Sequence, residues 1–485
     1  MTPSGEHNAR VPRQVWWALL AGGLLRLVAA WWCDGYFASD CYFHVLDPAW
    51  RWLFEPDAPM PSNFRSAFLP LLLHGVMKAG RAVGMEAPTT LLHLSYTALG
   101  AWSLLSVVFT YRLARIHLSE AVSVVAAWLV AVQFMMPHVS TQALVESAAA
   151  PPMVAGLWLF ERMRTAAHPR VADGVAAGAC LGLAALFRFH VGLVFVVAVV
   201  LAARQHNRSR LILSLCAGGV LPALLQGFVD LHTQGGFFVV LFRYVDYQLQ
   251  WANSYGVMPW HVFLAFFVGL TFPPLTAAIW RGMLDAARGM VTLTSALVVF
   301  AVVHSLVGHK EERFMFTVLP LFMVLLAAGL VDAWDSGARW RRAGVLMFAV
   351  GNAVLLGVFT LADPRRNVNE PLKELASQQP PAAVLGLGVG VRLAPLYAGW
   401  GAQVMEAFAD EELFQKKWRE ELRGDQVRVV LGASHVNVAI PEGWTCSEGR
   451  EFAGDHLDRF LILVNPQANR SRAPTRVRDC VRSAR

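Results

Sequence analysis

Long apolar stretches separated by short polar connections recur from Val15 to Leu361. Most are about 18 to 22 residues long, enough to cross a hydrocarbon core of roughly 30 Å as a helix. The pattern therefore predicts an all-α polytopic membrane protein with about eleven transmembrane helices. They are expected near residues 15–33, 90–111, 119–137, 143–161, 172–187, 189–203, 211–229, 260–280, 291–308, 314–332 and 343–361.

One further apolar segment, residues 66–84, is interrupted by His74, Lys78 and Arg81. Counting it as a span would put the later Arg-rich connections outside, against the preference of Lys and Arg for the cytoplasmic side. We therefore predict a surface helix over 66–84, within a first outer loop of residues 34–89. The amino terminus is then cytoplasmic, and everything after Leu361 lies outside.

The last quarter of the chain differs in character, because charged residues are frequent and its apolar runs are short. We predict that a transmembrane domain, residues 1–362, precedes a small extracytoplasmic α/β domain, residues 363–485. Cys446 and Cys480 fall in this tail, where an oxidising compartment would allow them to form a disulfide. Its run of alternating glycines from Gly386 to Gly390 is interpreted as a plain turn rather than a nucleotide site.

Composition supports the membrane assignment, since 56% of the residues are hydrophobic and only 15% are charged. A formal net charge of +7 is also found in proteins that bind nucleic acid. The excess Arg lies in short connections such as residues 162–170 and 339–342, so we interpret it as a topology signal and expect no nucleic acid. No Cys or His spacing typical of a metal site occurs, and we expect no metal.

Acidic residues gather in the first outer loop, at Asp34, Asp40 and Asp47. Asp40 and Asp47 are seven residues apart, which on an α-helix is two turns and places both carboxylates on one face. One carboxylate is then suited to act as a general base, while the other orients it or an acceptor hydroxyl. The alternative is that a polar loop simply contains acids.

The segment from His309 to Phe314 carries four formal charges and a histidine between two apolar runs. Cations beside the free amide groups of a helix start suit a phosphate group, and glutamates hold such cations in place. This pattern indicates a phosphate clamp; a solvated turn with internal ion pairs is the alternative.

This segment, followed by Pro320, resembles the signature of the dolichyl- and polyprenyl-phosphate-mannose-dependent mannosyltransferases, glycosyltransferase family 22. These enzymes build the asparagine-linked glycan precursor and the glycosylphosphatidylinositol anchor. The resemblance runs over roughly residues 15 to 335, although Asp40-Cys41 stands where the family usually has Asp-Glu. Further matching positions are Asp40 with Asp47-Pro48, Phe64-Arg65-Ser66, Arg188, Asp230 and Pro259-Trp260-His261.

The resemblance implies the GT-C glycosyltransferase fold and transfer of a hexose, mannose, from a polyprenyl-phosphate donor to a glycan or glycolipid acceptor, with inversion. Asp40 would be the general base, and Asp47 would orient the acceptor. The predicted donor phosphate ligands are His309, Lys310, Arg313, Arg188 and Arg65. The predicted supporting residues are Glu311, Glu312, Asp230 and His261. No cofactor is expected.

Two alternatives remain open at this stage. A transporter or flippase for a lipid-linked sugar would also need many helices and phosphate-binding cations, but it would need no base and tends to show internal repeats. A GT-C enzyme with another sugar, or with a protein or lipid A acceptor, is closer. The expected location is the inner membrane of a bacterium with a periplasmic active site; an endoplasmic reticulum membrane with a lumenal site is the alternative.

Overall fold

The computed structural model describes residues 11–60, 63–251, 253–254, 256–273, 276–377, 383–391, 397, 403–407, 410–464 and 472–483. The chain divides into two compact units. The first comprises Met1–Ala29, Asp57–Leu73 and Thr97–Thr360. The second comprises Ala30–Pro56, His74–Tyr96 and Leu361–Arg485, so it unites parts of the first predicted outer loop with the carboxyl-terminal tail.

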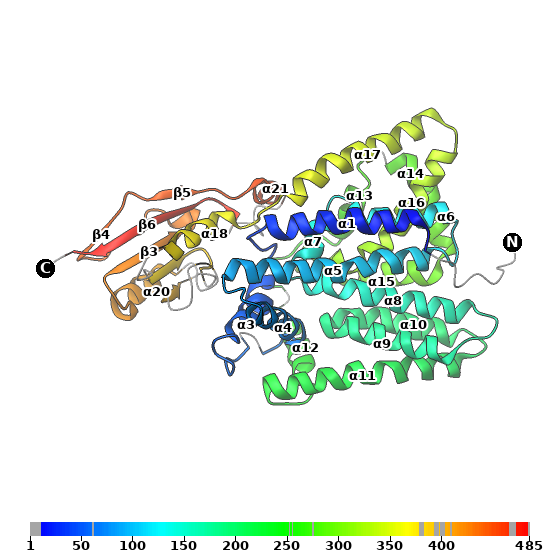
Figure 1. The fold of residues 1–485 in the computed structure, drawn as a ribbon, viewed down its shortest axis with the longest axis horizontal. Helices are drawn as coiled ribbons and strands as arrows, with labels where there is room; N and C mark the ends of the chain where they lie inside the picture. The colour runs from blue at the N-terminus through cyan, green and yellow to red at the C-terminus, as the bar shows by residue number, and fades with distance from the viewer. Residues whose placement is uncertain are drawn as a thin grey trace. The chain divides into compact units, whose positions relative to one another are not determined.

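Helices dominate the chain up to Thr360 (Figure 1). The α-helices are α1 (Arg13–Trp32), α2 (Ser39–Cys41), α3 (Asp47–Arg51), α4 (Phe68–Ala82), α5 (Pro88–Ala114), α6 (Glu120–Val132), α7 (Met136–Thr141), α8 (Val145–Thr165), α9 (Val171–Phe187), α10 (Gly192–Ala203), α11 (Arg208–Gln234), α12 (Val239–Trp251), α13 (Val262–Gly269), α14 (Thr276–Gly289), α15 (Val291–Leu306), α16 (Leu319–Asp335) and α17 (Arg339–Thr360). Short π or 3-10 turns are η1 (Tyr42–Leu46), η2 (Phe189–Val191) and η3 (Glu312–Val318).

The first unit is a bundle in which α9 packs against both α8 and α11, and α16 packs against α6 and α14. Glycines allow α9 and α11 to approach closely. A Cβ atom at Gly178 would lie 1.9 Å from the carbonyl oxygen of Leu215, and one at Gly218 would lie 1.9 Å from that of Val175. The helix axes are thus held together by backbone contact at this crossing.

Five helices among the described residues are long and apolar enough to cross a membrane, and a bent pair would make a sixth. They are Arg13–Trp32, Pro88–Ala114, Arg208–Gln234, Glu312–Asp335 and Arg339–Thr360, and the bent pair is Ala277–Gly289 with Val291–Leu306. Three shorter apolar helices accompany them, at Glu120–Val132, Val171–Phe187 and Phe189–Ala203. A multi-pass membrane protein is therefore confirmed, while the predicted number of eleven exceeds the spans that meet this criterion.

Two expectations about local structure are wrong. The helix predicted over 260–280 is interrupted between α13 and α14, where Phe272 has a φ of 54° and Pro273 follows it. Proline removes a backbone donor and cannot continue a helix, which accounts for the break. The connection between the helices predicted over 211–229 and 260–280 instead contains the end of α11 and the whole of α12. The helix predicted over 66–84 is present as α4.

The carboxyl-terminal part of the second unit contains a mixed six-stranded sheet in the order β2-β1-β3-β6-β4, with β5 also paired to β6. Pairing is parallel between β1 and its neighbours β2 and β3, and antiparallel at β6. The strands are β1 (Ala383–Leu387), β2 (Val404–Glu406), β3 (Gln426–Leu431), β4 (Trp444–Cys446), β5 (Arg450–Phe452) and β6 (Thr475–Arg482). The helices and turns are α18 (Arg366–Lys373), η4 (Glu374–Ser377), α20 (Glu411–Lys416), η5 (Lys417–Glu421), η6 (Ala433–His435) and α21 (His456–Val464).

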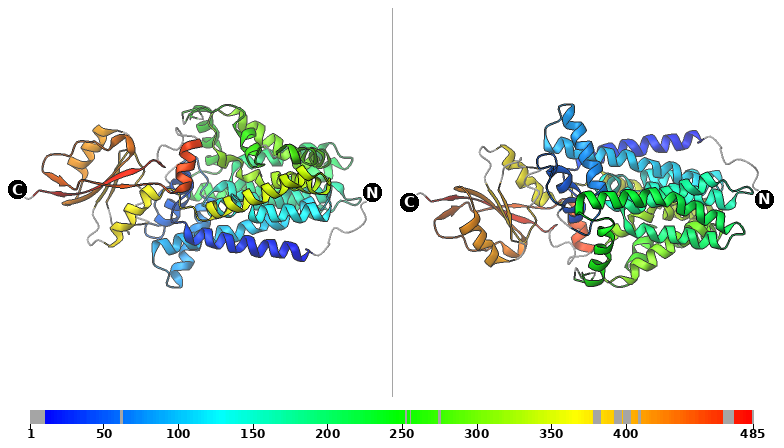
Figure 2. Two further views of the ribbon diagram at one scale, coloured as in Figure 1. Left: turned by 90° about the horizontal axis from the view of Figure 1, so that it is seen from above. Right: turned by 90° about the horizontal axis from the view of Figure 1, so that it is seen from below.

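Helices lie on both faces of this sheet (Figure 2). Phe414 and Trp418 pack on one face against Val427 and Val429 of β3. On the other face Arg428 donates a hydrogen bond of 2.7 Å to the carbonyl oxygen of Pro371 in α18. The alternation of β3 residues between the faces follows from strand geometry. The sheet confirms a small α/β region.

A disulfide joins Cys446 of β4 to Cys480 of β6, which are direct partners in the antiparallel register. The pairing that the sequence allowed is therefore present.

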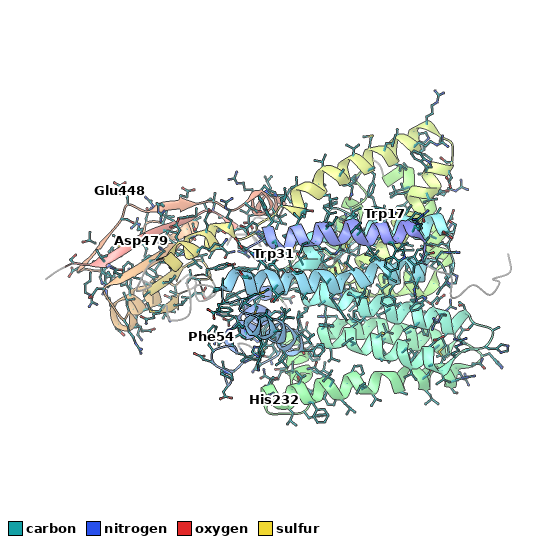
Figure 3. The ribbon with its side chains drawn as sticks, viewed as in Figure 1. Trp17, Trp31, Phe54, His232, Glu448 and Asp479 are labelled. Atoms are coloured by element: carbon teal, nitrogen blue, oxygen red, sulfur yellow. A yellow bond between two sulfur atoms is a disulfide. The ribbon has the colours of Figure 1, made fainter. Side chains whose placement is uncertain are left out.

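Exposed tryptophans mark both ends of α1 (Figure 3). Trp17 is 61% exposed and Trp31 is 51% exposed. Tryptophan is enriched at the two interfaces of a bilayer, so this placement fits a spanning helix.

Candidate functional site

The connection between α15 and η3 carries the charged segment that the sequence singled out. Lys310 is 3% exposed, and its ammonium group donates hydrogen bonds to the carbonyl oxygens of Met258 at 3.0 Å, Gly308 at 3.4 Å, and Val307. All three of its donors are thus engaged by backbone. The geometry favours a role in holding this connection over the predicted direct contact of Lys310 with a phosphate. Burial lowers the pKa of its ammonium group.

Glu311 holds two of the predicted cations. Its carboxylate accepts hydrogen bonds of 2.6 and 2.9 Å from Arg313, and it lies 2.9 Å from the imidazole Nε2 of His309. Glu312 begins η3 and is partly exposed. The structure therefore brings His309, Glu311 and Arg313 together as one charged group.

A buried carboxylate, Glu146 at the start of α8, joins Arg313 to Arg188. Its Oε1 lies 2.8 Å from Arg188 and 3.6 Å from Arg313. Glu146 is 3% exposed and each arginine is 6% exposed, so these charges are almost removed from water. The two buried guanidinium groups thus share one carboxylate, and Arg313 has a second one in Glu311, so the charges of these two arginines are balanced.

Arg188 has a further partner in His304 of α15. The His304 Nδ1 lies 2.8 Å from the carbonyl oxygen of Phe300, and its Nε2 lies 3.4 Å from Arg188 Nη2. An Nδ1 that faces a carbonyl carries the proton, so we infer that Nε2 accepts from Arg188. The guanidinium group also lies over the rings of Phe300 and Phe314, at 5.9 and 5.3 Å. These contacts fix its plane.

Arg65 lies among aromatic side chains. Its guanidinium carbon is 5.5 Å from the ring centre of Phe64 and 5.8 Å from that of Tyr244 in α12. The hydroxyl of Tyr244 is in turn 3.1 Å from Nε2 of His190. Arg65 and Arg313 both lie close enough to Arg188 to repel it electrostatically. We define the cation cluster as Arg65, Arg188, Arg313 and His309 with the carboxylates Glu146 and Glu311.

Two predicted supporting residues lie elsewhere. Asp230 lies within α11, is fully buried, and accepts hydrogen bonds from Gln226 and from the backbone N–H of Val240 at 3.1 Å. These bonds connect the end of α11 to the start of α12. His261 is exposed at the start of α13, with its ring 5.7 Å from that of Trp260. In the described part of the chain it makes no hydrogen bond to the cation cluster.

Asp40 and Asp47 belong to the second unit, where α2, η1 and α3 form one continuous helical stretch. The π turn η1 lies between the two residues and has more residues per turn than an α-helix. Seven residues therefore no longer correspond to two turns, which was the reason for expecting both carboxylates on one face. Asp47 has a side chain 9% exposed, bonded to Arg51 at 2.9 Å and to the hydroxyl of Tyr42 at 3.4 Å. Asp40 has a side chain 31% exposed and lies 3.7 Å from His44. Asp40 is thus the more accessible carboxylate.

Over residues 15–384 the chain matches the Alg9-like mannosyltransferase family. The chain belongs to this family. Among the curated family relatives, it is 25% identical over 145 residues to GPI alpha-1,2-mannosyltransferase 3 of Danio rerio, covering 29% of this chain and 26% of that protein. It is 28% identical over 167 residues to GPI mannosyltransferase 3 of Eremothecium gossypii, covering 32% and 28%. The match thus spans less than a third of these relatives' own length.

Solved structures show the fold of this Alg9-like chain. ArnT from Cupriavidus metallidurans bound to undecaprenyl phosphate superposes with a TM-score of 0.64 at 15% identity, covering 96% of this chain and 97% of that one. The Archaeoglobus fulgidus oligosaccharyltransferase gives 0.56 at 16% identity, covering 87% and 68%. Mycobacterial arabinofuranosyltransferase AftD gives 0.54 at 14%, covering 100% and 41%. The predicted GT-C fold is confirmed.

Sequence reasoning did not place Glu146, His190 or His304 in the site. Glu146 had a visible signal, an acid at the start of a helix after a short polar turn, but that signal equally indicates capping. His304 lies inside an apolar helix and gives no local pattern. In the described ranges no three His, Cys, Asp or Glu side chains converge as the ligands of one metal ion would.

Proposed function

We propose that the protein transfers a hexose, mannose, from a polyprenyl-phosphate donor to the hydroxyl of a glycan or glycolipid acceptor. The observation that carries this proposal is the cation cluster, in which the three guanidinium groups of Arg65, Arg188 and Arg313 face only two carboxylates, in a chain of the Alg9-like mannosyltransferase family. A cluster with more arginines than carboxylates carries a net positive charge that suits a phosphate, and Arg binds phosphate with a planar, multidentate geometry. The undecaprenyl phosphate bound by ArnT, which has the same fold, supports a donor of this class.

In the proposed reaction the acceptor hydroxyl attacks the anomeric carbon while Asp40 removes its proton. The bond from that carbon to the phosphate oxygen breaks, and its electron pair leaves with the polyprenyl phosphate. Arg188, Arg313 and Arg65 would stabilise the charge that develops on the phosphate, as preorganised cations do in low-dielectric sites. Because the phosphate is a good leaving group, no general acid is needed.

Two predicted roles change in this proposal. Asp47 is bonded to Arg51 and Tyr42, so we propose that it fixes the helical turn that carries Asp40 instead of orienting the acceptor directly. Lys310 would hold the connection that presents His309 and Arg313. Glu311 would keep Arg313 in a single orientation.

The proposed location is the extracytoplasmic side of a bacterial inner membrane. The disulfide between Cys446 and Cys480 supports an oxidising compartment for the sheet domain.

The proposal is tested with the purified full-length protein in detergent, incubated with radiolabelled polyprenyl-phosphate mannose and a lipid extract of the source cells. We expect a labelled glycolipid or glycan from this donor, none from a nucleotide-linked mannose, and an unchanged rate after chelation of divalent metals. Lack of transfer from any polyprenyl-phosphate sugar, combined with movement of the labelled lipid across reconstituted vesicles, would instead establish a transporter.

A further inference from the structure

The short segment from Asp34 to Asp40, which carries the proposed base, is held largely by residues of the carboxyl-terminal part of the second unit. Asp363 accepts hydrogen bonds from the backbone N–H groups of Asp34 at 3.0 Å and Gly35 at 2.8 Å. The hydroxyl of Tyr397 donates to the carbonyl oxygen of Asp34. The backbone N–H groups of Asp34 and Gly35 and the carbonyl oxygen of Asp34 are thus all bonded to residues more than 300 positions away in the chain.

Gly35 lets these two parts of the chain touch. A Cβ atom at this position would lie 1.7 Å from the carbonyl oxygen of Pro364. No side chain fits in that space, so contact with residue 364 requires glycine.

Asp34 adds an ion pair to the same contact. Its carboxylate lies 2.8 Å from His93 and is also bonded to Lys373 of α18. Burial alone would raise the pKa of Asp34, but the hydrogen bonds from His93 and Lys373 lower it below its usual value. The carboxylate therefore stays charged and keeps its hold on α18.

The next turn of the segment is held by Arg472, which precedes β6. This side chain is 3% exposed, bonds to Asp458 of α21 at 2.6 Å, and donates a second hydrogen bond to the carbonyl oxygen of Phe37. Asp458 is fully buried. A fork of two bonds from one guanidinium group thus ties α21 to the backbone three residues before Asp40.

Arg365 makes the last connection, directly beside the proposed base. It has a φ of 67°, an unfavourable conformation for a side chain other than glycine, and Asp458 accepts its backbone N–H at 2.8 Å. Its guanidinium group lies 5.7 Å from the ring of Tyr36 and donates to the hydroxyl of Ser39 at 3.4 Å. Asp458 therefore fixes both arginines, and through them the residues on each side of Ala38.

We propose that the carboxyl-terminal domain is a part of the catalytic apparatus, in which Arg472 and Arg365 are positioning residues that set the orientation of Asp40. This inference rests on the proposed function. A base displaced by about 1 Å costs on the order of a hundredfold in rate, so a rigid support for Asp40 has a direct catalytic consequence.

The test compares Arg472→Gln with Arg472→Lys in the full chain, with Arg459→Gln as the matched control. Arg459 is an exposed arginine next to Asp458 on the same helix, and it is not part of the fork. The readouts are kcat, KM for the donor, and amide hydrogen exchange over residues 35–41 and over β1 and β3.

We expect Arg472→Gln to lower kcat at least about tenfold with KM for the donor within about twofold. Exchange should rise in residues 35–41 and stay unchanged in β1 and β3. Arg472→Lys keeps the charge opposite Asp458 without the fork, so it should fall between the wild type and Arg472→Gln. Arg459→Gln should match the wild type. Equal kcat and equal exchange in Arg472→Gln and Arg459→Gln would overturn the proposal.

If Arg472→Gln also raises hydrogen exchange in β1 and β3, its effect on kcat could come from a destabilised sheet, and Ser39→Ala is then the deciding variant. It removes only the hydroxyl that Arg365 bonds, and we expect faster exchange over residues 39–41 and a kcat lowered several-fold; no change in either would overturn the proposal. If the wild type transfers no sugar at all, the proposed function fails, while the exchange over residues 35–41 still decides whether Arg472 holds this segment.

Discussion

Glu146 is the most consequential side chain that was not among the site residues predicted from the sequence. It is the shared counter-ion of Arg188 and Arg313, and all three are nearly excluded from water. Removing one member of such a group leaves buried charge without compensation, which typically costs about 3–5 kcal/mol.

We therefore expect Glu146→Gln to lower the free energy of unfolding by roughly 3 kcal/mol or more, measured by thermal unfolding in detergent. Glu120→Gln is the control, because Glu120 is exposed in the first turn of α6 and its interaction with the helix dipole contributes about 0.3–1 kcal/mol. Equal melting temperatures for the two variants would show that the arginines do not depend on Glu146.

Asp363 provides a pH-dependent prediction outside the spanning helices. Burial raises the pKa of its carboxyl from 3.8 to about 6, an effect that Lys373 opposes and Asp34 reinforces. The folded protein thus holds this proton more tightly than the unfolded chain. Its contribution to stability is fully present below pH 3.8 and is lost as the pH rises through about 6, a difference of roughly 3 kcal/mol.

Asp363→Asn has no such proton to lose and keeps an acceptor for the N–H groups of Asp34 and Gly35. Between pH 4 and pH 6.5 we expect the wild type to lose stability from this group and the variant to be less affected, as followed by thermal unfolding. The pKa of Asp34 is lowered, so its contribution to stability is lost as the pH falls rather than as it rises. That loss takes place below the usual pKa of 3.8, outside the pH range of this experiment. The same pH dependence in both proteins would contradict the assignment.

At the scale of elements, periodicity located most helices because long apolar runs leave few alternatives to a helix. It failed where a distant side chain ends an element. The helix predicted over 119–137 stops at Val132, since Arg26 of α1 donates to the carbonyl oxygens of Val130 at 3.0 Å and Ala131 at 2.9 Å. A buried cation that caps a neighbouring helix has no local pattern.

The charged elements show the same limit. The density of charge from His309 to Arg313 was visible in the sequence, and the sharing of Glu311 between two cations follows its spacing. The three hydrogen bonds from Lys310 to backbone carbonyl groups could not be predicted in this way. They depend on the residue at which α15 ends and on Met258, which is distant in the chain. The π turn between Asp40 and Asp47 likewise arises without a distinctive sequence signal.

For the whole molecule, composition and family resemblance predicted the membrane class and the GT-C fold, because both depend on features spread along the chain. The grouping of residues 30–56 and 74–96 with the carboxyl-terminal region could not be predicted. It depends on single contacts across more than 300 residues, such as those of Asp363 and Arg472 with the segment that carries Asp40.

The central claim is that Asp40 removes the proton of the acceptor hydroxyl in transfer from a polyprenyl-phosphate sugar. The most direct measurement is the transfer rate of Asp40→Asn at equal folded yield, with Asp57→Asn as the control, since Asp57 is an exposed carboxylate in the same predicted outer loop. The account predicts that Asp40→Asn slows transfer by about 10²- to 10⁴-fold and that Asp57→Asn matches the wild type. An unchanged rate in Asp40→Asn would contradict it.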